Sequence, residues 1–196
     1  AFYRVNIHKK NEILGVFAAN KIDCVVHLAG KKSVRGAEKE SFECYRTNME
    51  ATYMLLECMK IAGVHNIVCA SSASVYGRIA TLPYQEIMPK GDCTTPHAWT
   101  HFMMEMIVED VCISNPRMSA MNLRIFSPEG YHPSGLLGET PDAIHNTILY
   151  HICMAAAGQK PMTVYGMGYP TPDGTCMRDF FHVSDLGKGI VKACEY

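Results

Sequence analysis

Short apolar segments rich in β-branched residues recur along the chain, and longer stretches with helical periodicity separate them. The apolar segments are FYRVNI at 2–7, DCVVHLAG at 23–30, NIVCASSASVYG at 66–77 and SAMNLRIF at 119–126. Their length and composition are typical of strands that are buried on both faces of a sheet. We therefore predict four strands at these positions.

Helical patterns lie between these segments, at 11–20, 41–62 and 96–113, and a further helix is expected around 142–157. Gly63 follows the second helix at the place where a glycine commonly ends one. Strict alternation of strand and helix implies right-handed crossovers and a parallel sheet. Ligands of such sheets bind outside the carboxyl ends of the strands. The Gly- and Pro-rich stretch at 127–176 is typical of loops and a small cap over that crevice.

Composition narrows the class of protein. The 196 residues carry a formal net charge of -1 and are 48% hydrophobic, which fits one α/β-sized domain and lacks the basic excess of a nucleic-acid-binding protein. No apolar run approaches the roughly 18 residues of a membrane span. The nine cysteines are scattered and form no C-x-x-C motif, so we expect reduced thiols in a cytoplasmic protein.

Three blocks carry a more specific signal: SSASVYG, HPSGLLGETP and PDGTCMRDFFHVSDL. In this order and spacing they resemble the UDP-glucose 4-epimerases, which are extended short-chain dehydrogenases/reductases. VVHLAGKKSV, CYRTNMEATYMLLECM and VYGMGYPTPDGT extend the resemblance over essentially the whole chain. It implies a Rossmann-type doubly wound parallel sheet that holds NAD, joined to a small UDP-sugar-binding part. NAD takes a hydride from C4 of the sugar in that family and returns it to the other face.

The resemblance also implies a division of the chain. Residues 1–126 would form a partial NAD-binding domain, and 127–196 the start of the UDP-sugar-binding part, with 178–196 packing back on the first domain.

The family's catalytic positions fall on Ser72, His97 and His101. In the family, a Tyr takes the O4 proton, and a Lys four residues later lowers the phenol pKa and binds the nicotinamide ribose. Here both positions are histidines, on one face of a helix. An imidazole can act as a base near neutral pH. It is shorter than a phenol, however, and a misplacement of about 1 Å can cost on the order of 100-fold in rate.

We interpret His97 and His101 as a degenerate catalytic dyad, since the ribose clamp and the positive charge of the lysine are also missing. Two partly exposed histidines without a role are a second interpretation. A zinc pair is a third, but it would need at least one or two further ligands and no other metal-type cluster is seen, so no metal site is expected.

The resemblance places further contacts on this sequence. NAD would meet Asn6, Ile7, Leu28, Ala29, Gly30, Lys32, Asn48 and Phe126, and the UDP-sugar would meet Ser127, Thr147, Ile148, Tyr165 and Arg178. Gly30 would allow close backbone approach, and Arg178 would pair with a phosphate. The alternatives are a turn glycine for Gly30, a solvated lysine for Lys32, a surface position for Asn48 and a structural ion pair for Arg178.

Several of these positions depart from the family. Asn6 replaces an Asp, Ser127 and Thr147 each replace an Asn, and Ile125 replaces a Tyr beside the nicotinamide. The departures therefore cluster at ligand contacts, while the scaffold blocks persist.

The G-x-x-G-x-x-G turn that binds the pyrophosphate in this fold is not found. YGMGYPTPDG is glycine-rich but lacks the strand-turn-helix context. FYRVNI corresponds to the third strand, and roughly 55–60 residues with strands 1 and 2 would precede it in the family. Those two strands would lie between FYRVNI and DCVVHL, and a sheet cannot keep such a gap. Either the chain is cut from a longer one, another segment fills the gap, or the third strand has moved.

Two functions follow. The first is a catalytically inactive relative of the UDP-glucose 4-epimerases, kept as a binding or scaffold subunit of a larger assembly. The alternative is an active NAD-dependent UDP-glucose/UDP-galactose 4-epimerase that uses His97 as its base. By resemblance, a homodimer would form through the helices at 41–62 and 96–113. NAD binding is doubtful without the glycine-rich turn, and the chain is expected to be a fragment.

Overall fold

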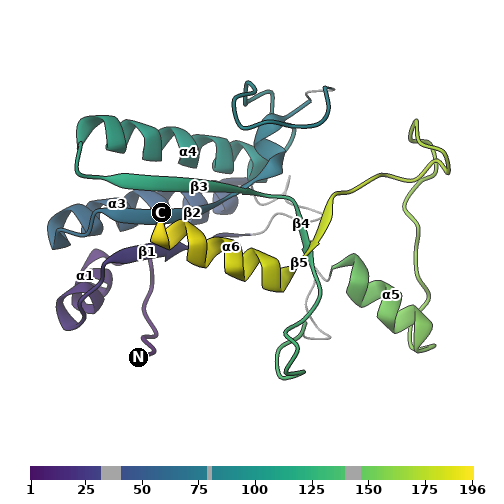
Figure 1. The fold of residues 1–196 in the computed structure, drawn as a ribbon, viewed down its shortest axis with the longest axis horizontal. Helices are drawn as coiled ribbons and strands as arrows, with labels where there is room; N and C mark the ends of the chain where they lie inside the picture. Colours follow the sequence, from purple (N-terminus) through teal and green to yellow (C-terminus); the bar gives the residue numbers. More distant parts are fainter. Residues whose placement is uncertain (32–40, 79–80, 140–146) are drawn as a thin grey trace. The chain divides into compact units, whose positions relative to one another are not determined.

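A computed structural model describes residues 1–31, 41–78, 81–139 and 147–196 (Figure 1). The chain divides into two compact units, which we describe separately. The first comprises Ala1–Ile125 together with Lys192–Tyr196, and the second comprises Phe126–Val191.

The first unit contains alternating helices and strands. They are α1 (Lys10–Ala19), β1 (Cys24–His27), α2 (Ser41–Tyr45), a π-helical turn (Arg46–Glu50), α3 (Ala51–Ala62), β2 (Asn66–Ser72), a 3-10 turn (Ala73–Tyr76), α4 (Pro96–Ser114) and β3 (Ser119–Ile125). The three strands form a parallel sheet in the order β1-β2-β3, with Val26 opposite Val68 and Val68 opposite Met121. The predicted α/β fold with a parallel sheet is confirmed.

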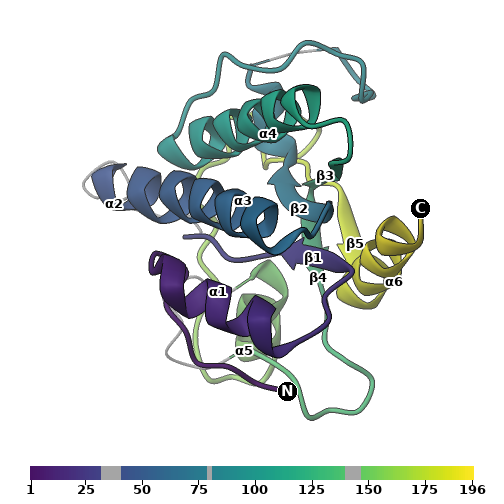
Figure 2. The same cartoon turned by 90° about the vertical axis from the view of Figure 1, so that its left-hand side faces the viewer.

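Helices α1, α3 and α4 cover one face of this sheet, and Figure 2 shows them together on one side of the strands. The core between them consists of Ile13, Leu55, Leu56, Cys58, Met59, Val64, Ile67, Cys69, Val108 and Met118. Each fully buried side chain of this size contributes roughly 1.5–3 kcal/mol, so this face holds the sheet and the helices together.

The helix ends follow local sequence signals. Gly63 takes the left-handed conformation, with φ 71°, and the Val64 N–H donates to the Met59 carbonyl at 3.0 Å. The predicted stop at Gly63 is confirmed. At the start of α4, the Thr95 hydroxyl accepts from the Ala98 N–H at 3.2 Å, and Pro96 occupies the first turn.

Three expected elements differ in the structure. FYRVNI is not a strand, because no described segment pairs with it and an isolated strand leaves its backbone groups unpaired. Phe2 is 90% exposed there. The helix at 41–62 is interrupted by the π-helical turn. The strand at 66–77 ends at Ser72, because Ser72 caps the following 3-10 turn.

The second unit contains two short parallel strands and two helices. These are β4 (Ser127–Glu129), α5 (Ile148–Ala156), β5 (Phe180–His182) and α6 (Val183–Glu195), whose last residues belong to the first unit. The expected helix at 142–157 is present from Ile148 to Ala156, and its first residues lie outside the described ones. None of the described helices is both long and apolar enough to cross a membrane.

Candidate functional site

The histidine pair lies in the first two turns of α4. His97 and His101 are both partly exposed, and their Nε2 atoms are 3.1 Å apart and share a hydrogen bond. The ring centroids are 4.4 Å apart, with 64° between the ring planes. The sequence prediction that the two side chains share one helix face therefore holds, and they are in direct contact.

His101 is electrically neutral at pH 7. Burial and the neighbouring His97 lower its pKa from 6.5 to about 4, against smaller opposing effects of Glu105 and the Ala70 backbone. A lysine at this position would carry a positive charge at the same pH. The site therefore lacks the cation that the resemblance places there.

Asn48 connects the loop after β1 to α4. Its side chain is 1% exposed, and its Oδ1 accepts from the Lys31 N–H at 2.6 Å. Its Nδ2 donates to Thr100 Oγ1 at 3.0 Å, and the Thr100 hydroxyl donates to the His97 carbonyl at 2.8 Å. Asn48 is thus not a surface residue, and it fixes the start of α4 relative to β1.

Gly30 lies against this link. A Cβ atom on Gly30 would stand 3.2 Å from the Asn48 Oδ1. The absence of a side chain at Gly30 lets the loop after β1 pass close to Asn48, and this packing is a structural reason for the glycine.

Ser72 is the last residue of β2. Its Oγ accepts from the Ser74 N–H at 3.2 Å and from the Ser74 hydroxyl at 2.9 Å. The hydroxyl therefore caps the 3-10 turn that follows the strand.

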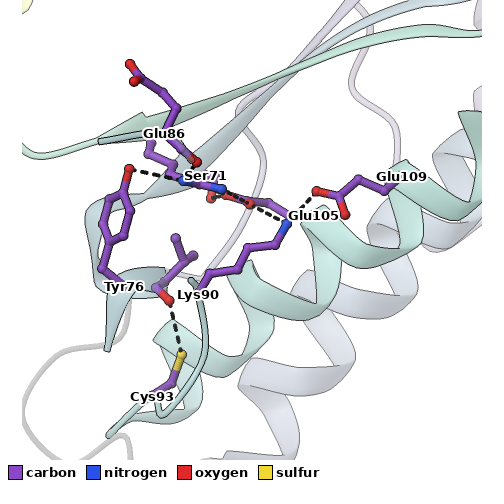
Figure 3. A network of polar contacts seen from close by, with 9 residues as sticks. Ser71, Tyr76, Glu86, Lys90, Cys93, Glu105 and Glu109 are labelled. Carbon is purple, nitrogen blue, oxygen red and sulfur yellow. Dashed lines mark hydrogen bonds and ion pairs between the residues drawn. The ribbon is translucent and has the colours of Figure 1, made fainter. Parts of the chain in front are cut away.

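A buried charge network, not foreseen from the sequence, lies one turn beyond His101 (Figure 3). The Glu105 carboxylate is 1% exposed and accepts from the Ser71 hydroxyl at 2.5 Å, from Lys90 Nζ at 3.0 Å and from Arg124 Nη2 at 2.9 Å. Arg124 also donates to the Tyr76 hydroxyl at 3.0 Å. The network ties α4 to β2, to β3 and to the segment before α4.

Electrostatics favours the charged forms of Glu105 and Arg124. Burial alone would raise the pKa of Glu105, but hydrogen bonds from Arg124, Ser71 and Lys90 lower it below its ordinary value. The Glu105 carboxylate in turn raises the pKa of Arg124. A sequence signal existed, because Glu105 interrupts the apolar run FMMEMIV, and charged residues are seldom buried unless paired.

The second unit has a cavity of its own, of about 640 Å³. It is lined by Pro128–Pro133, Leu137–Glu139, Thr147, Val183, Ser184 and Gly187. Thr147 caps α5, and its N–H donates to Glu139 Oε2 at 2.8 Å. Of the five predicted sugar-nucleotide contacts, Thr147 alone is among these lining residues.

The other four lie elsewhere in the second unit. Ser127 belongs to β4, opposite Phe180, and Ile148 is the first residue of α5, 43% exposed. Tyr165 is 67% exposed, and Arg178 is exposed and donates from Nη1 to the Met177 carbonyl at 3.0 Å.

Comparison with known proteins identifies the family of this chain. The sequence profile described as NAD dependent epimerase/dehydratase family matches residues 1–196. The chain belongs to this family. A UDP-glucose 4-epimerase of Neisseria meningitidis serogroup B is 45% identical over 195 residues, and one of Drosophila melanogaster is 40% identical over 195 residues. Each alignment covers 99% of the chain, and it covers 58% and 56% of the two relatives.

A solved structure is similar throughout. The UDP-glucose 4-epimerase of Bifidobacterium longum, in complex with NAD+ and UDP, has a TM-score of 0.93 and 39% identity, over 98% of this chain and 58% of that one. The chain thus spans somewhat more than half the length of these epimerase/dehydratase relatives.

The cofactor contacts expected of this epimerase/dehydratase member are only partly gathered at one place. Leu28, Ala29 and Gly30 are exposed at the carboxyl end of β1, next to Asn48. Lys32 lies outside the described residues. The remaining three are Asn6, whose Oδ1 accepts from the His8 N–H at 3.0 Å, Ile7, which packs against the core, and Phe126, which is 38% exposed in the second unit.

A metal site with three or more ligands is not seen in the described part of the chain. No group of three His, Cys, Asp or Glu side chains there is placed to hold an ion. All nine cysteines are free thiols.

Proposed function

We propose that this chain is part of a catalytically inactive relative of the UDP-glucose 4-epimerases, kept as a binding or scaffold subunit of a larger assembly in the cytoplasm. The observation that carries the proposal is the hydrogen-bonded pair of His97 and His101, in which His101 is neutral. The free thiols of all nine cysteines support the cytoplasmic location.

Epimerisation at C4 makes two demands on this site. A base must take the O4 proton, and a cation beside the base must lower its pKa and hold the ribose of NAD. The imidazole of His97 is turned toward His101, and the neutral His101 supplies no charge. The residues present therefore do not fit catalysis with NAD.

Exposed apolar side chains on the helices support a role in assembly. Tyr53 and Ile61 of α3 are 58% and 57% exposed, and Ile113 of α4 is 79% exposed. Exposed apolar side chains that gather into a patch are typical of protein contacts. A homodimer or a partner of another sequence would bury them. Light scattering of the full-length protein that gave a monomer, together with failure to bind any partner, would count against this role.

The experiment that tests inactivity is conversion of UDP-galactose to UDP-glucose by the full-length protein with added NAD. A double variant, His97→Tyr with His101→Lys, is assayed beside it. We expect no conversion by the wild type, since a misplaced base alone can cost on the order of 100-fold in rate. Conversion by the double variant would show that the loss is confined to the pair.

The second candidate function, epimerisation with His97 as the base, rests on the partial exposure of its imidazole. Conversion by the wild type would establish it and refute the scaffold proposal. A rate that fell in a His97→Gln variant would then identify the base.

A further inference from the structure

His97 and His101 stand where the family has a tyrosine and a lysine, and their Nε2 atoms lie 3.1 Å apart at the partly exposed start of α4. We propose that His97 and His101 form a two-point chelate for a first-row transition metal ion such as Ni²⁺ or Cu²⁺. The proposal is independent of whether the protein catalyses a reaction.

The separation of the two nitrogen atoms fits one metal ion. Imidazole nitrogens bind such ions at about 2.0–2.1 Å, so two of them lie about 2.9 Å apart at a right angle and about 3.3 Å apart at the tetrahedral angle. The observed 3.1 Å falls between these values. Residues four apart on a helix are neighbours, and α4 holds both rings on one rigid element of 19 residues.

The helix itself is firmly placed, which lowers the cost of organising the site. Thr95 caps its first turn, and the Asn48–Thr100 link reaches the His97 carbonyl. One turn later, Glu105 fixes the same helix to β2 and β3. Ligands held on packed elements lose little freedom on binding.

Binding requires the lone pairs of both Nε2 atoms, so the proton in the shared hydrogen bond must move. His101 Nδ1 is buried and has no hydrogen-bond partner among the described residues, which favours the proton on its Nε2. When a metal replaces this hydrogen bond, the proton shifts from Nε2 to Nδ1 of the same ring. His101 thus keeps its one ring proton, which moves from one nitrogen of the ring to the other.

The chemistry of the ligands indicates which ions bind. Imidazole suits Ni²⁺, Cu²⁺ and Zn²⁺, with affinity rising from Co²⁺ through Ni²⁺ to Cu²⁺. The described residues offer no third ligand, so water would complete the coordination at the exposed side. The site would therefore be weaker than a structural zinc site and open to a further ligand.

The test is calorimetric titration of the full-length, tag-free protein with Ni²⁺. We expect the wild type to bind one equivalent of Ni²⁺ and a His97→Ala/His101→Ala double variant to lose that equivalent. The double variant keeps every cysteine, so binding by thiols would remain in it. Removing a residue that only hydrogen-bonds to a metal ligand typically lowers metal affinity by about 10- to 100-fold. Removing a ligand itself, as in the single variants His97→Ala and His101→Ala, should therefore weaken binding by at least about tenfold. His151→Ala, an exposed histidine of α5, is the matched control and should bind like the wild type.

A second measurement needs no variant. Paramagnetic Ni²⁺ should broaden the ring signals of His97 and His101 in NMR spectra at the first equivalent, before those of other histidines. The proposal is overturned if these two signals stay sharp, or if the double variant binds as many equivalents with unchanged affinity.

Discussion

Glu105 shows how one buried charge can organise a helix. Its carboxylate accepts hydrogen bonds from Arg124 and Lys90, both 16% exposed, and from the Ser71 hydroxyl. Loss of one member of such a buried group typically costs about 3–5 kcal/mol, because the remaining charges stay buried without a counter-charge. An exposed ion pair contributes about 0–1 kcal/mol. The same lysine makes both kinds of contact, since Lys90 also pairs with the exposed Glu109.

We expect Glu105→Gln to lower the free energy of unfolding by about 3 kcal/mol at pH 7, measured by urea denaturation. Glu109→Gln removes a carboxylate from the same lysine and should cost less than about 1 kcal/mol. Equal losses in the two variants would show that burial of Glu105 adds nothing.

Comparison of the wild type with Glu105→Gln also tests the pH dependence of stability. The pKa of Glu105 is lowered in the folded protein, so its contribution is present above the ordinary pKa of 4.5 and is lost as the pH falls through the folded value. The stability difference between wild type and Glu105→Gln should therefore shrink below pH 4.5. A difference that stayed constant down to pH 3 would contradict the lowered pKa.

At the scale of elements, the crossing of two segments next to α4 requires a glycine. Gly77 ends the 3-10 turn with φ 64°, and the Gly91 N–H donates to the Val75 carbonyl at 2.8 Å. A Cβ atom on Gly77 would overlap the Gly91 carbonyl oxygen and lie 2.6 Å from that of Asp92. The crossing matters because the segment before Gly91 carries Lys90 to Glu105.

Gly63 provides the control for this crossing, because it has a similar φ of 71° but no atom within 4 Å of an added Cβ. Gly63→Ala should cost about 1–2 kcal/mol, from the left-handed backbone alone. Gly77→Ala adds overlap with backbone atoms and should cost about 3 kcal/mol or more in the same denaturation assay. If the two alanine variants were equally stable, the close crossing would have no energetic role.

At the scale of the whole molecule, the sequence predicts what depends on local patterns. Apolar runs predict the strands β1, β2 and β3, and a turn residue predicts the helix end at Gly63. Helical spacing predicts the contact between His97 and His101. The strand predicted at FYRVNI was wrong, because a strand forms only beside a neighbour with which it can pair.

The charge network around Glu105 was missed for a related reason. Glu105 lies 34 positions from Ser71 and 19 positions from Arg124 in the sequence, so only the folded chain brings these side chains together. The low pKa of His101 likewise depends on burial, which periodicity does not measure.

The two units differ in how much apolar surface they bury, and this difference predicts how the chain opens. β2 lies between β1 and β3, and Ile67 and Cys69 belong to the core of the first unit. Among the described residues of the second unit, Tyr150 is the one buried hydrophobic side chain, and its strands are three residues long. Segments with few buried contacts open at a lower free energy than a core strand.

Native-state hydrogen exchange should therefore report two levels of protection. Amides of β2 should exchange at least about tenfold more slowly than those of α5 and β4, a difference of about 1.4 kcal/mol in opening free energy. Tyr150→Ala should speed exchange in the second unit and leave β2 unchanged, whereas Met59→Ala, in the core of α3, should lower protection of β2. Uniform protection, with both variants affecting both units, would mean that the chain opens as one cooperative body and that the buried surface of the first unit stabilises the second as well.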